Sequence, residues 1–194
     1  EYLHATSLIN ALTLPALAAI AVLAHDIVSL LYGSAWLQAV PAIPWLCFAY
    51  AVSSLFTLSA PALTGVGKPY AAIGPNALLV VSKVACAAWL MDGTLGTFAM
   101  AIALGQLLSV PYNLWIHERY LRLGWTAWAR STGPVVVQAV LVGCVCLGIR
   151  EALPAGFAPW AAIAVTGCGA LAAFLAGCFL LSLPMAEELK RMQK

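Results

Sequence analysis

The sequence predicts an all-α protein, a polytopic bundle of about six membrane-spanning helices with both ends in the cytoplasm. Three observations predict it: an extreme apolar composition, apolar segments of membrane length, and basic residues gathered in alternate connections. Of the 194 residues, 63% are hydrophobic and 8% are charged. Soluble domains have about 45–50% and 25%, so a soluble fold of this length could not bury the apolar surface.

The apolar segments are long enough to cross a bilayer, which requires about 20 mostly apolar residues for a helix. The segments span residues 6–24, 37–63, 70–91, 95–116, 134–149 and 160–183. The fifth is the shortest, and Arg150 closes it. Prolines lie inside several of these segments, which membrane helices tolerate where neighbouring groups satisfy the freed carbonyls.

Basic residues alternate between the connections. One set of connections and the tail contain seven basic residues: Lys68, Arg119, Arg122, Arg130, Lys190, Arg191 and Lys194. The opposite set contains His25-Asp26, Asp92 and Arg150-Glu151, with a single arginine. The positive-inside rule therefore predicts cytoplasmic N- and C-termini.

The connection over residues 118–133 mixes arginines with tryptophan and leucine. This mixture predicts an amphipathic stretch lying on the cytoplasmic membrane surface. A plain, positively charged loop is the alternative interpretation.

Polar side chains recur on one face of the first four predicted helices. Helical spacing places polar residues on one face of three of them: Thr6, Asn10 and Thr13 on the first, Asn76 and Lys83 on the third, and Gln106, Ser109 and Asn113 on the fourth. The second helix carries Ser53, Ser54, Thr57 and Thr64. In a membrane such faces turn toward other protein or a wet cavity, so we expect these four helices to line a hydrophilic interior. Interhelical hydrogen bonding is the alternative. The fifth and sixth helices offer little beyond Gln138 and Thr166 and are expected to be peripheral.

Lys83 is the one charge within the apolar third segment, and no acidic residue is close to it in sequence. Placing a lysine at mid-membrane costs roughly 2.5–3.5 kcal/mol on insertion scales, which predicts a functional site with a negatively charged partner. The alternative is that the long side chain extends toward the membrane surface near Asp92.

Other side chains give no indication of catalysis. Acidic residues fall at the ends of the predicted spans, and the six cysteines lack metal-ligand spacing. His4, His25 and His117 are also at span ends and are not grouped. We therefore predict no enzyme activity, no metal and no cofactor, and the net charge of +2 gives no indication of nucleic-acid binding. A cavity cation without a carboxylate suits an anionic substrate such as a lipid diphosphate.

Two motifs carry a family resemblance. Leu14-Pro15 followed by residues 26–36 (DIVSLLYGSAW) resembles the C-terminal lobe of polysaccharide biosynthesis flippases, in which a proline-bearing helix precedes an LLYG-x-x-W element. Residues 62–69 (ALTGVGKP) resemble the short cytoplasmic turn of the same family. The motifs cover about residues 14–69, and the later helices match in number, spacing and orientation. The family belongs to the multidrug/oligosaccharidyl-lipid/polysaccharide (MOP) exporter superfamily.

The resemblance implies two six-helix lobes around a central cavity, sometimes with two further C-terminal helices. It implies export of undecaprenyl-diphosphate-linked oligosaccharides across the bacterial inner membrane by alternating access, for lipopolysaccharide or exopolysaccharide synthesis. Residues 1–117 would be four helices of the second lobe, 118–133 a cytoplasmic connection, 134–183 two accessory transmembrane helices and 184–194 a cytoplasmic tail. We expect the chain to be the C-terminal part of a longer protein.

The first functional hypothesis is thus a lipid-linked oligosaccharide flippase whose partners are the bilayer, the lipid-linked glycan and an N-terminal lobe of the same chain. The expected substrate-binding residues are Lys83, Asn76, Gln106, Asn113 and Asn10, with Lys68, Arg119 and Arg122 at the cytoplasmic mouth. Two alternatives remain: a multidrug antiporter lobe of the same superfamily and a non-transporting membrane scaffold subunit. The lack of a carboxylate within the predicted spans counts against the antiporter.

Overall fold

The computed structural model describes residues 2–90, 92–154 and 158–180, and in these ranges the chain is helical and contains no strand. Six stretches are long and apolar enough to cross a membrane: Tyr2–Val22, Ser34–Gly65, Pro69–Leu90, Leu95–Leu121, Trp125–Ala152 and Pro159–Cys178. This confirms the predicted all-α polytopic bundle. Residue 91, residues 181–183 of the sixth predicted helix and the tail 184–194, with Lys190, Arg191 and Lys194, lie outside the described residues.

Several spans are built from more than one helix. The elements in chain order are α1 (Tyr2–Val22), α2 (Ala24–Leu31), η1 (Ser34–Ala42), α3 (Ile43–Ser54), α4 (Ser59–Gly65), η2 (Pro69–Ala72), α5 (Ile73–Leu90), α6 (Leu95–Leu108), α7 (Val110–Leu121), α8 (Trp125–Ala152) and α9 (Pro159–Leu180). The second span thus combines η1, α3 and α4, the third combines η2 and α5, and the fourth combines α6 and α7. Helices α1 and α2 meet at Leu23, directly before the connection residues His25 and Asp26.

The break between α6 and α7 has a local cause. Pro111 has no N–H group, so it cannot continue the ladder of backbone hydrogen bonds into α7. The chain compensates at Ser109, whose backbone N–H and hydroxyl both donate to the Gln106 carbonyl, at 3.2 and 2.7 Å. The result is a bent span whose polar side chains gather near the bend.

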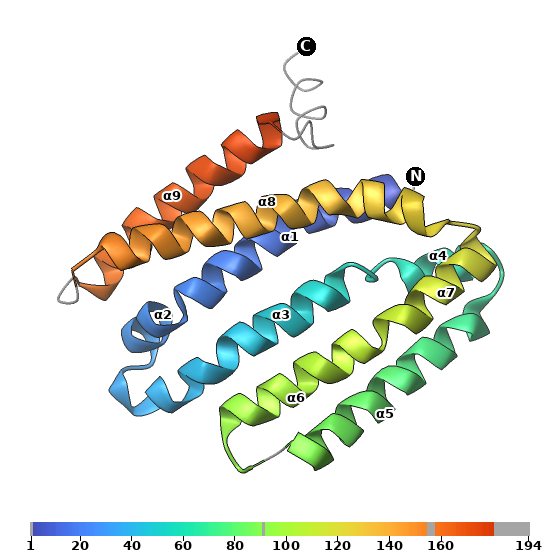
Figure 1. Cartoon of the computed structure of the whole chain (residues 1–194), viewed down its shortest axis with the longest axis horizontal. Coiled ribbons are helices and arrows are strands. Elements are labelled where there is room, and N and C mark those ends of the chain that lie inside the picture. Colours follow the sequence, from blue (N-terminus) through green and yellow to red (C-terminus); the bar gives the residue numbers. More distant parts are fainter. Residues whose placement is uncertain (1, 91, 155–157, 181–194) are drawn as a thin grey trace.

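The helices lie side by side in the order α9, α8, α1, α3, α6 and α5, with α7 continuing α6 (Figure 1). Helix α8 therefore runs along α1, and α5 forms one edge of the array. The last two helices, which the sequence predicts to be peripheral, lie beyond α1 at one side of the array, with α8 between α1 and α9. Ala11, Leu14, Val135 and Cys178 form a buried cluster there.

The expected amphipathic connection over residues 118–133 is not a separate element. Helix α7 continues to Leu121, Arg122 adopts a left-handed conformation (φ 53°), and its N–H bonds to the His117 carbonyl. Helix α8 then begins at Trp125 and runs for 28 residues, with Pro134 inside it. Apolar residues around Trp125 and Trp128 extend the helix beyond the span that hydropathy alone predicts.

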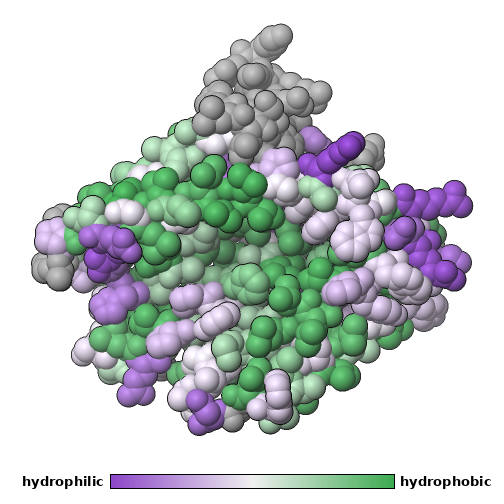
Figure 2. Space-filling view, in the orientation of Figure 1, coloured by the Kyte–Doolittle hydropathy of each residue, from purple (hydrophilic) through white to green (hydrophobic). Residues whose placement is uncertain are grey.

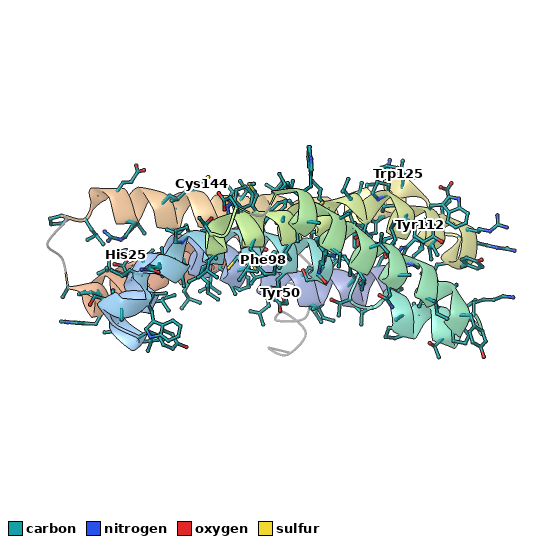
Figure 3. The ribbon with its side chains drawn as sticks, turned by 90° about the horizontal axis from the view of Figure 1, so that it is seen from below. His25, Tyr50, Phe98, Tyr112, Trp125 and Cys144 are labelled. Carbon is teal, nitrogen blue, oxygen red and sulfur yellow. The ribbon has the colours of Figure 1, made fainter. Side chains whose placement is uncertain are left out.

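Charged connections gather at the two ends of the array. The space-filling view shows an apolar band whose two ends are hydrophilic (Figure 2). Tyr112 and Trp125 lie toward one end and His25 toward the other (Figure 3). Lys68 and Arg122 lie in connections at the end that holds α4 and α7, whereas α2, the end of α8 and the start of α9 lie at the opposite end. A belt of apolar surface between polar ends is the form of a multi-pass membrane protein.

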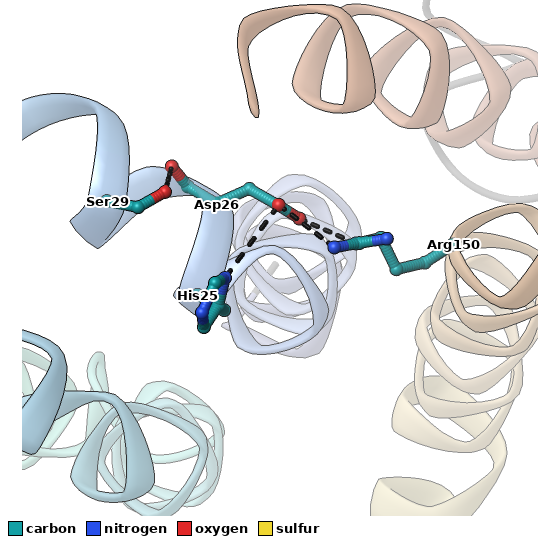
Figure 4. A network of polar contacts seen from close by, with 4 residues as sticks. All are labelled: His25, Asp26, Ser29 and Arg150. Atoms are coloured by element: carbon teal, nitrogen blue, oxygen red, sulfur yellow. Dashed lines mark hydrogen bonds and ion pairs between the residues drawn. The ribbon is translucent and has the colours of Figure 1, made fainter. Parts of the chain in front are cut away.

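An ion pair ties α2 to the last turn of α8, and the sequence did not predict it. Arg150 donates from Nε to Asp26 Oδ2 at 2.7 Å and from Nη2 to Oδ1 at 3.1 Å (Figure 4). The Asp26 side chain is only 4% exposed. Asp26 also occupies the first turn of α2, where the helix dipole favours a negative charge. The Asp26 carboxylate, although it lies at a span end, is therefore buried and paired with Arg150.

Candidate functional site

A cavity of about 220 Å³ lies where α3, α4, α5, α6 and α7 meet. Helix α3 and the turn after it contribute Ser53 and Thr57, and α4 contributes Ser59. Phe56, Leu63 and Leu79 are among its apolar walls. The remaining polar side chains come from α5, α6 and α7: Asn76, Gln106 and Asn113.

Three of the five predicted substrate-binding residues thus come together around one cavity, although they lie on different helices. Asn76 is exposed, Gln106 is buried and Asn113 is half-buried. Lys83 and Asn10 do not line this cavity. The helix breaks explain the placement, because the bends after Ser54 and at Ser109 open a space that Asn76, Gln106 and Asn113 face.

The cavity retains unused hydrogen-bonding capacity. Within the described part of the chain, the side chains of Asn76 and Gln106 make no hydrogen bond to protein, and neither do the hydroxyls of Ser53 and Thr57. Asn113 uses its Nδ2 to donate to the Ser109 carbonyl at 3.0 Å, which leaves its side-chain oxygen available. Amide and hydroxyl groups in this arrangement suit a polar, uncharged ligand surface.

Lys83 packs against a glycine. A Cβ built on Gly105 would lie 2.6 Å from Lys83 Cα and 2.9 Å from Lys83 Cγ, so only glycine allows α5 and α6 to approach this closely. The neighbouring Ser82 hydroxyl donates to the Gly105 carbonyl at 2.8 Å and fixes the contact. Lys83 is partly exposed and has no ion pair or hydrogen bond with any described residue.

Asn10 lies on α1, whose neighbours include α3 and α8. It is fully buried, and neither atom of its amide has a hydrogen-bond partner in the described residues. The polar face of α1 therefore packs against other helices, as the spacing predicts. Asn10 does not, however, face the cavity that is lined by Asn76, Gln106 and Asn113.

The residues expected at the cytoplasmic mouth lie at the same end of the array as the cavity. Arg119 and Arg122 are in the last turn and the cap of α7, and Ile116 of the same helix lines the cavity. Lys68 lies between α4 and η2, which also contribute to the wall. All three cations are exposed, and the Arg119 guanidinium lies 5.5 Å from the centre of the Trp115 ring.

Sequence reasoning missed a buried cluster centred on His117, which is 1% exposed. The Tyr2 hydroxyl lies 2.7 Å from His117 Nε2, and the Ser59 hydroxyl lies 3.0 Å from the same nitrogen. Nδ1 lies 2.6 Å from the Asn113 carbonyl. The spacing signal was present, since His117 follows Gln106, Ser109 and Asn113 on one helical face. The contacts with Tyr2 and Ser59 span 115 and 58 residues, which no local pattern reveals.

A second hollow, of about 470 Å³, is a groove between α1, α3 and α8 with almost entirely apolar walls. Leu17, Phe48, Leu55, Val140 and Leu147 are typical of its walls.

In the described residues, no three histidine, cysteine, aspartate or glutamate side chains come together as metal ligands. Comparison of the chain with known protein families, curated proteins and solved structures found no match.

Proposed function

We propose that this chain forms part of one lobe of a flippase that exports undecaprenyl-diphosphate-linked oligosaccharides across the bacterial inner membrane by alternating access. The observation that supports the proposal is the cavity of amide and hydroxyl side chains at the basic end of a membrane-spanning bundle. The family motifs in residues 14–69 supply the substrate class.

The chemistry of the cavity fits the sugar part of such a substrate. Sugars present many hydroxyl groups, each of which both donates and accepts hydrogen bonds. The amides of Asn76 and Gln106, which bond to none of the described residues, offer both functions. An oligosaccharide is uncharged over much of its surface, so a cavity wall with hydroxyl and amide groups binds it without a charged partner.

The diphosphate requires positive charge. Because Lys83 does not line the cavity, we assign the headgroup attraction to Lys68, Arg119 and Arg122 at the end of the bundle beside it. Exposed basic residues at a membrane surface attract anionic lipid headgroups, by about 1 kcal/mol for each residue near the surface. An N-terminal lobe would complete the translocation path around the same cavity.

Liposome transport of a fluorescent undecaprenyl-diphosphate oligosaccharide tests the proposal, with the intact protein reconstituted and glycan access monitored on each side. We expect Gln106→Leu and Asn76→Leu to lower the rate, because each removes hydrogen-bonding groups from the cavity. Thr13→Val is the matched control, since Thr13 is outside the cavity and, among the described residues, bonds only to the Ile9 carbonyl of its own helix.

Two results would contradict the proposal. The first is a transport rate in both cavity variants equal to that of Thr13→Val. The second is transport of a hydrophobic cation in place of the glycan by the unmodified protein, which would favour the multidrug antiporter. A protein that moves neither compound while remaining folded would favour a scaffold subunit.

A further inference from the structure

We propose that His117 is a proton-binding switch whose protonation releases the first turn of α1 from α4 and α7. The proposal rests on the buried cluster of Tyr2, Ser59, His117 and the Asn113 carbonyl, and it does not depend on which substrate occupies the cavity. The bound ligand is the proton itself.

The geometry defines the neutral state of the ring. His117 Nδ1 lies 2.6 Å from the Asn113 carbonyl, which only accepts, so Nδ1 carries a proton. Nε2 of the neutral ring then accepts one hydrogen bond through its single lone pair. The Tyr2 hydroxyl, at 2.7 Å, is the nearer donor, and the Ser59 hydroxyl lies 3.0 Å from Nε2 and 3.5 Å from the Tyr2 oxygen. The neutral imidazole therefore connects α1, α4 and α7 through one side chain.

Protonation reverses the direction of these bonds. An imidazolium donates from both nitrogens, so Nε2 no longer accepts from Tyr2 or Ser59. The new N–H can donate to one hydroxyl oxygen, and the hydroxyl proton that Nε2 accepted needs another acceptor. Protonation therefore reorients the hydrogen bonds at Nε2 and places a positive charge inside the buried cluster.

The surroundings do not compensate a positive charge. The Tyr2 and Ser59 hydroxyls approach His117 Nε2, and the aromatic rings of Tyr2 and Phe56 lie 5.6 Å from the imidazole, centre to centre. Tyr2 is the titratable group among them, and no described carboxylate is within ion-pair distance. Helices α3, α4 and α6 contain no charged residue. The charged or titratable residues nearest in sequence on the other helices are exposed: His4 of α1, Glu118 and Arg119 of α7, and Arg130 of α8.

A charge buried without a partner is unfavourable, so protonation favours a state in which water reaches His117. The simplest route is withdrawal of the Tyr2 side chain, which links α1 to Ser59 and His117. Ser59 and Asn113 also line the polar cavity, so the same event alters two cavity walls. Proton binding and cavity shape are coupled through these two residues.

Nitrogen-15 NMR of histidine-labelled protein in lipid nanodiscs tests the switch. His4→Gln and His25→Gln leave His117 as the one histidine, and both replaced side chains are exposed. We expect a neutral ring protonated on Nδ1 at high pH, converting to imidazolium as the pH is lowered. In parallel, hydrogen exchange of α1, corrected for intrinsic rates, should show protection near Tyr2, at the amides from Thr6 onward that bond back to the first turn, at high pH. This protection should be lost with the same midpoint.

Matched variants separate a switch from a purely structural histidine. Tyr2→Phe keeps the ring and removes one donor to the neutral imidazole, so the midpoint should move to higher pH by about half to one unit. Ser59→Ala should move it in the same direction, and both variants remain informative if His117→Asn does not fold. In His117→Asn, exchange near Tyr2 should be fast and independent of pH after correction.

Three results would overturn the proposal. The first is a ring that stays neutral throughout the range in which the protein is folded. The second is protonation without loss of protection near Tyr2. The third is a midpoint unchanged in both Tyr2→Phe and Ser59→Ala.

Discussion

The two hollows of this bundle differ in how their walls are built. The polar cavity lies at breaks in three spans: the turn between α3 and α4, the bend at Ser109, and the η2–α5 junction with Pro75. The apolar groove lies along the unbroken parts of α1, α3 and α8. A break in a helix leaves backbone groups without their helical hydrogen-bond partners and leaves room between helices, so polar side chains gather there. Continuous helices satisfy their own backbone and present apolar faces.

The largest stability effect is expected on the groove side, at the ion pair that ties α2 to α8. Arg150→Met leaves Asp26 buried without its partner. Removing one member of a fully buried pair costs about 3–5 kcal/mol, and we expect about 2–3 kcal/mol because the Arg150 side chain is 31% exposed. Unfolding of the reconstituted protein by titration with a denaturing detergent measures the loss.

Glu151→Gln, at the exposed neighbouring position, is the control for the ion pair. The double variant Asp26→Asn/Arg150→Met removes both charges and should recover much of the lost stability. Equal stability of Arg150→Met and Glu151→Gln would show that the pair contributes nothing measurable.

The next effect is on the cavity side, at the contact between α5 and α6. Gly105→Ala places a methyl group 2.6 Å from Lys83 Cα, so the helices must separate, and we expect a loss of about 1–3 kcal/mol. Gly143→Ala on α8 is the matched control in the groove wall, where the new methyl meets Ala18 Cβ at 3.5 Å, an ordinary contact.

Both glycine substitutions are inside helices, so both gain similar helix propensity. The difference between their free energies of unfolding therefore isolates the cost of packing the new methyl group. Gly105→Ala should also lower transport, because it displaces a wall of the cavity. The same unfolding midpoint for Gly105→Ala and Gly143→Ala would refute the close α5–α6 contact.

A smaller effect should distinguish two buried glutamines. Gln138 in α8 donates to the Phe174 carbonyl at 3.0 Å, so Gln138→Leu should cost about 1 kcal/mol. Gln106 has no such bond in the described residues, so Gln106→Leu should leave stability nearly unchanged while it lowers transport. A larger loss of stability in Gln106→Leu than in Gln138→Leu would contradict the assignment of Gln106 to a ligand-facing wall.

The smallest effect is expected at Lys83. Lys83→Met keeps the apolar part of the side chain against Gly105, so stability should change by less than about 0.5 kcal/mol. Because Lys83 does not line the cavity, transport should stay close to that of the unmodified protein. Loss of transport with stability unchanged would restore Lys83 as a substrate ligand and move the binding site toward the α5–α6 contact.

Periodicity and charge were enough to predict the spans and much of the cavity. Asn76, Gln106 and Asn113 could be singled out because polar residues are costly in lipid and must turn inward wherever the helices pack. The same reasoning placed Asn10 and Lys83 in that cavity, because a polar face indicates burial but does not identify the neighbouring helix. Continuing the Gln106–Asn113 face by one turn would have found His117.

The sequence by itself determined that this chain is a bundle of apolar helices with charged ends, because composition and 3.6-residue periodicity act locally and do not depend on the neighbour. Only the tertiary structure decided that α8 packs between α1 and α9, that Arg150 pairs with Asp26, and that Tyr2 and Ser59 meet at His117. Apart from the packing of α9 on α8, where Gln138 bonds to Phe174, these contacts join residues more than 50 positions apart. They depend on which helices lie side by side, and in a chain so uniformly apolar that order leaves little trace in the sequence.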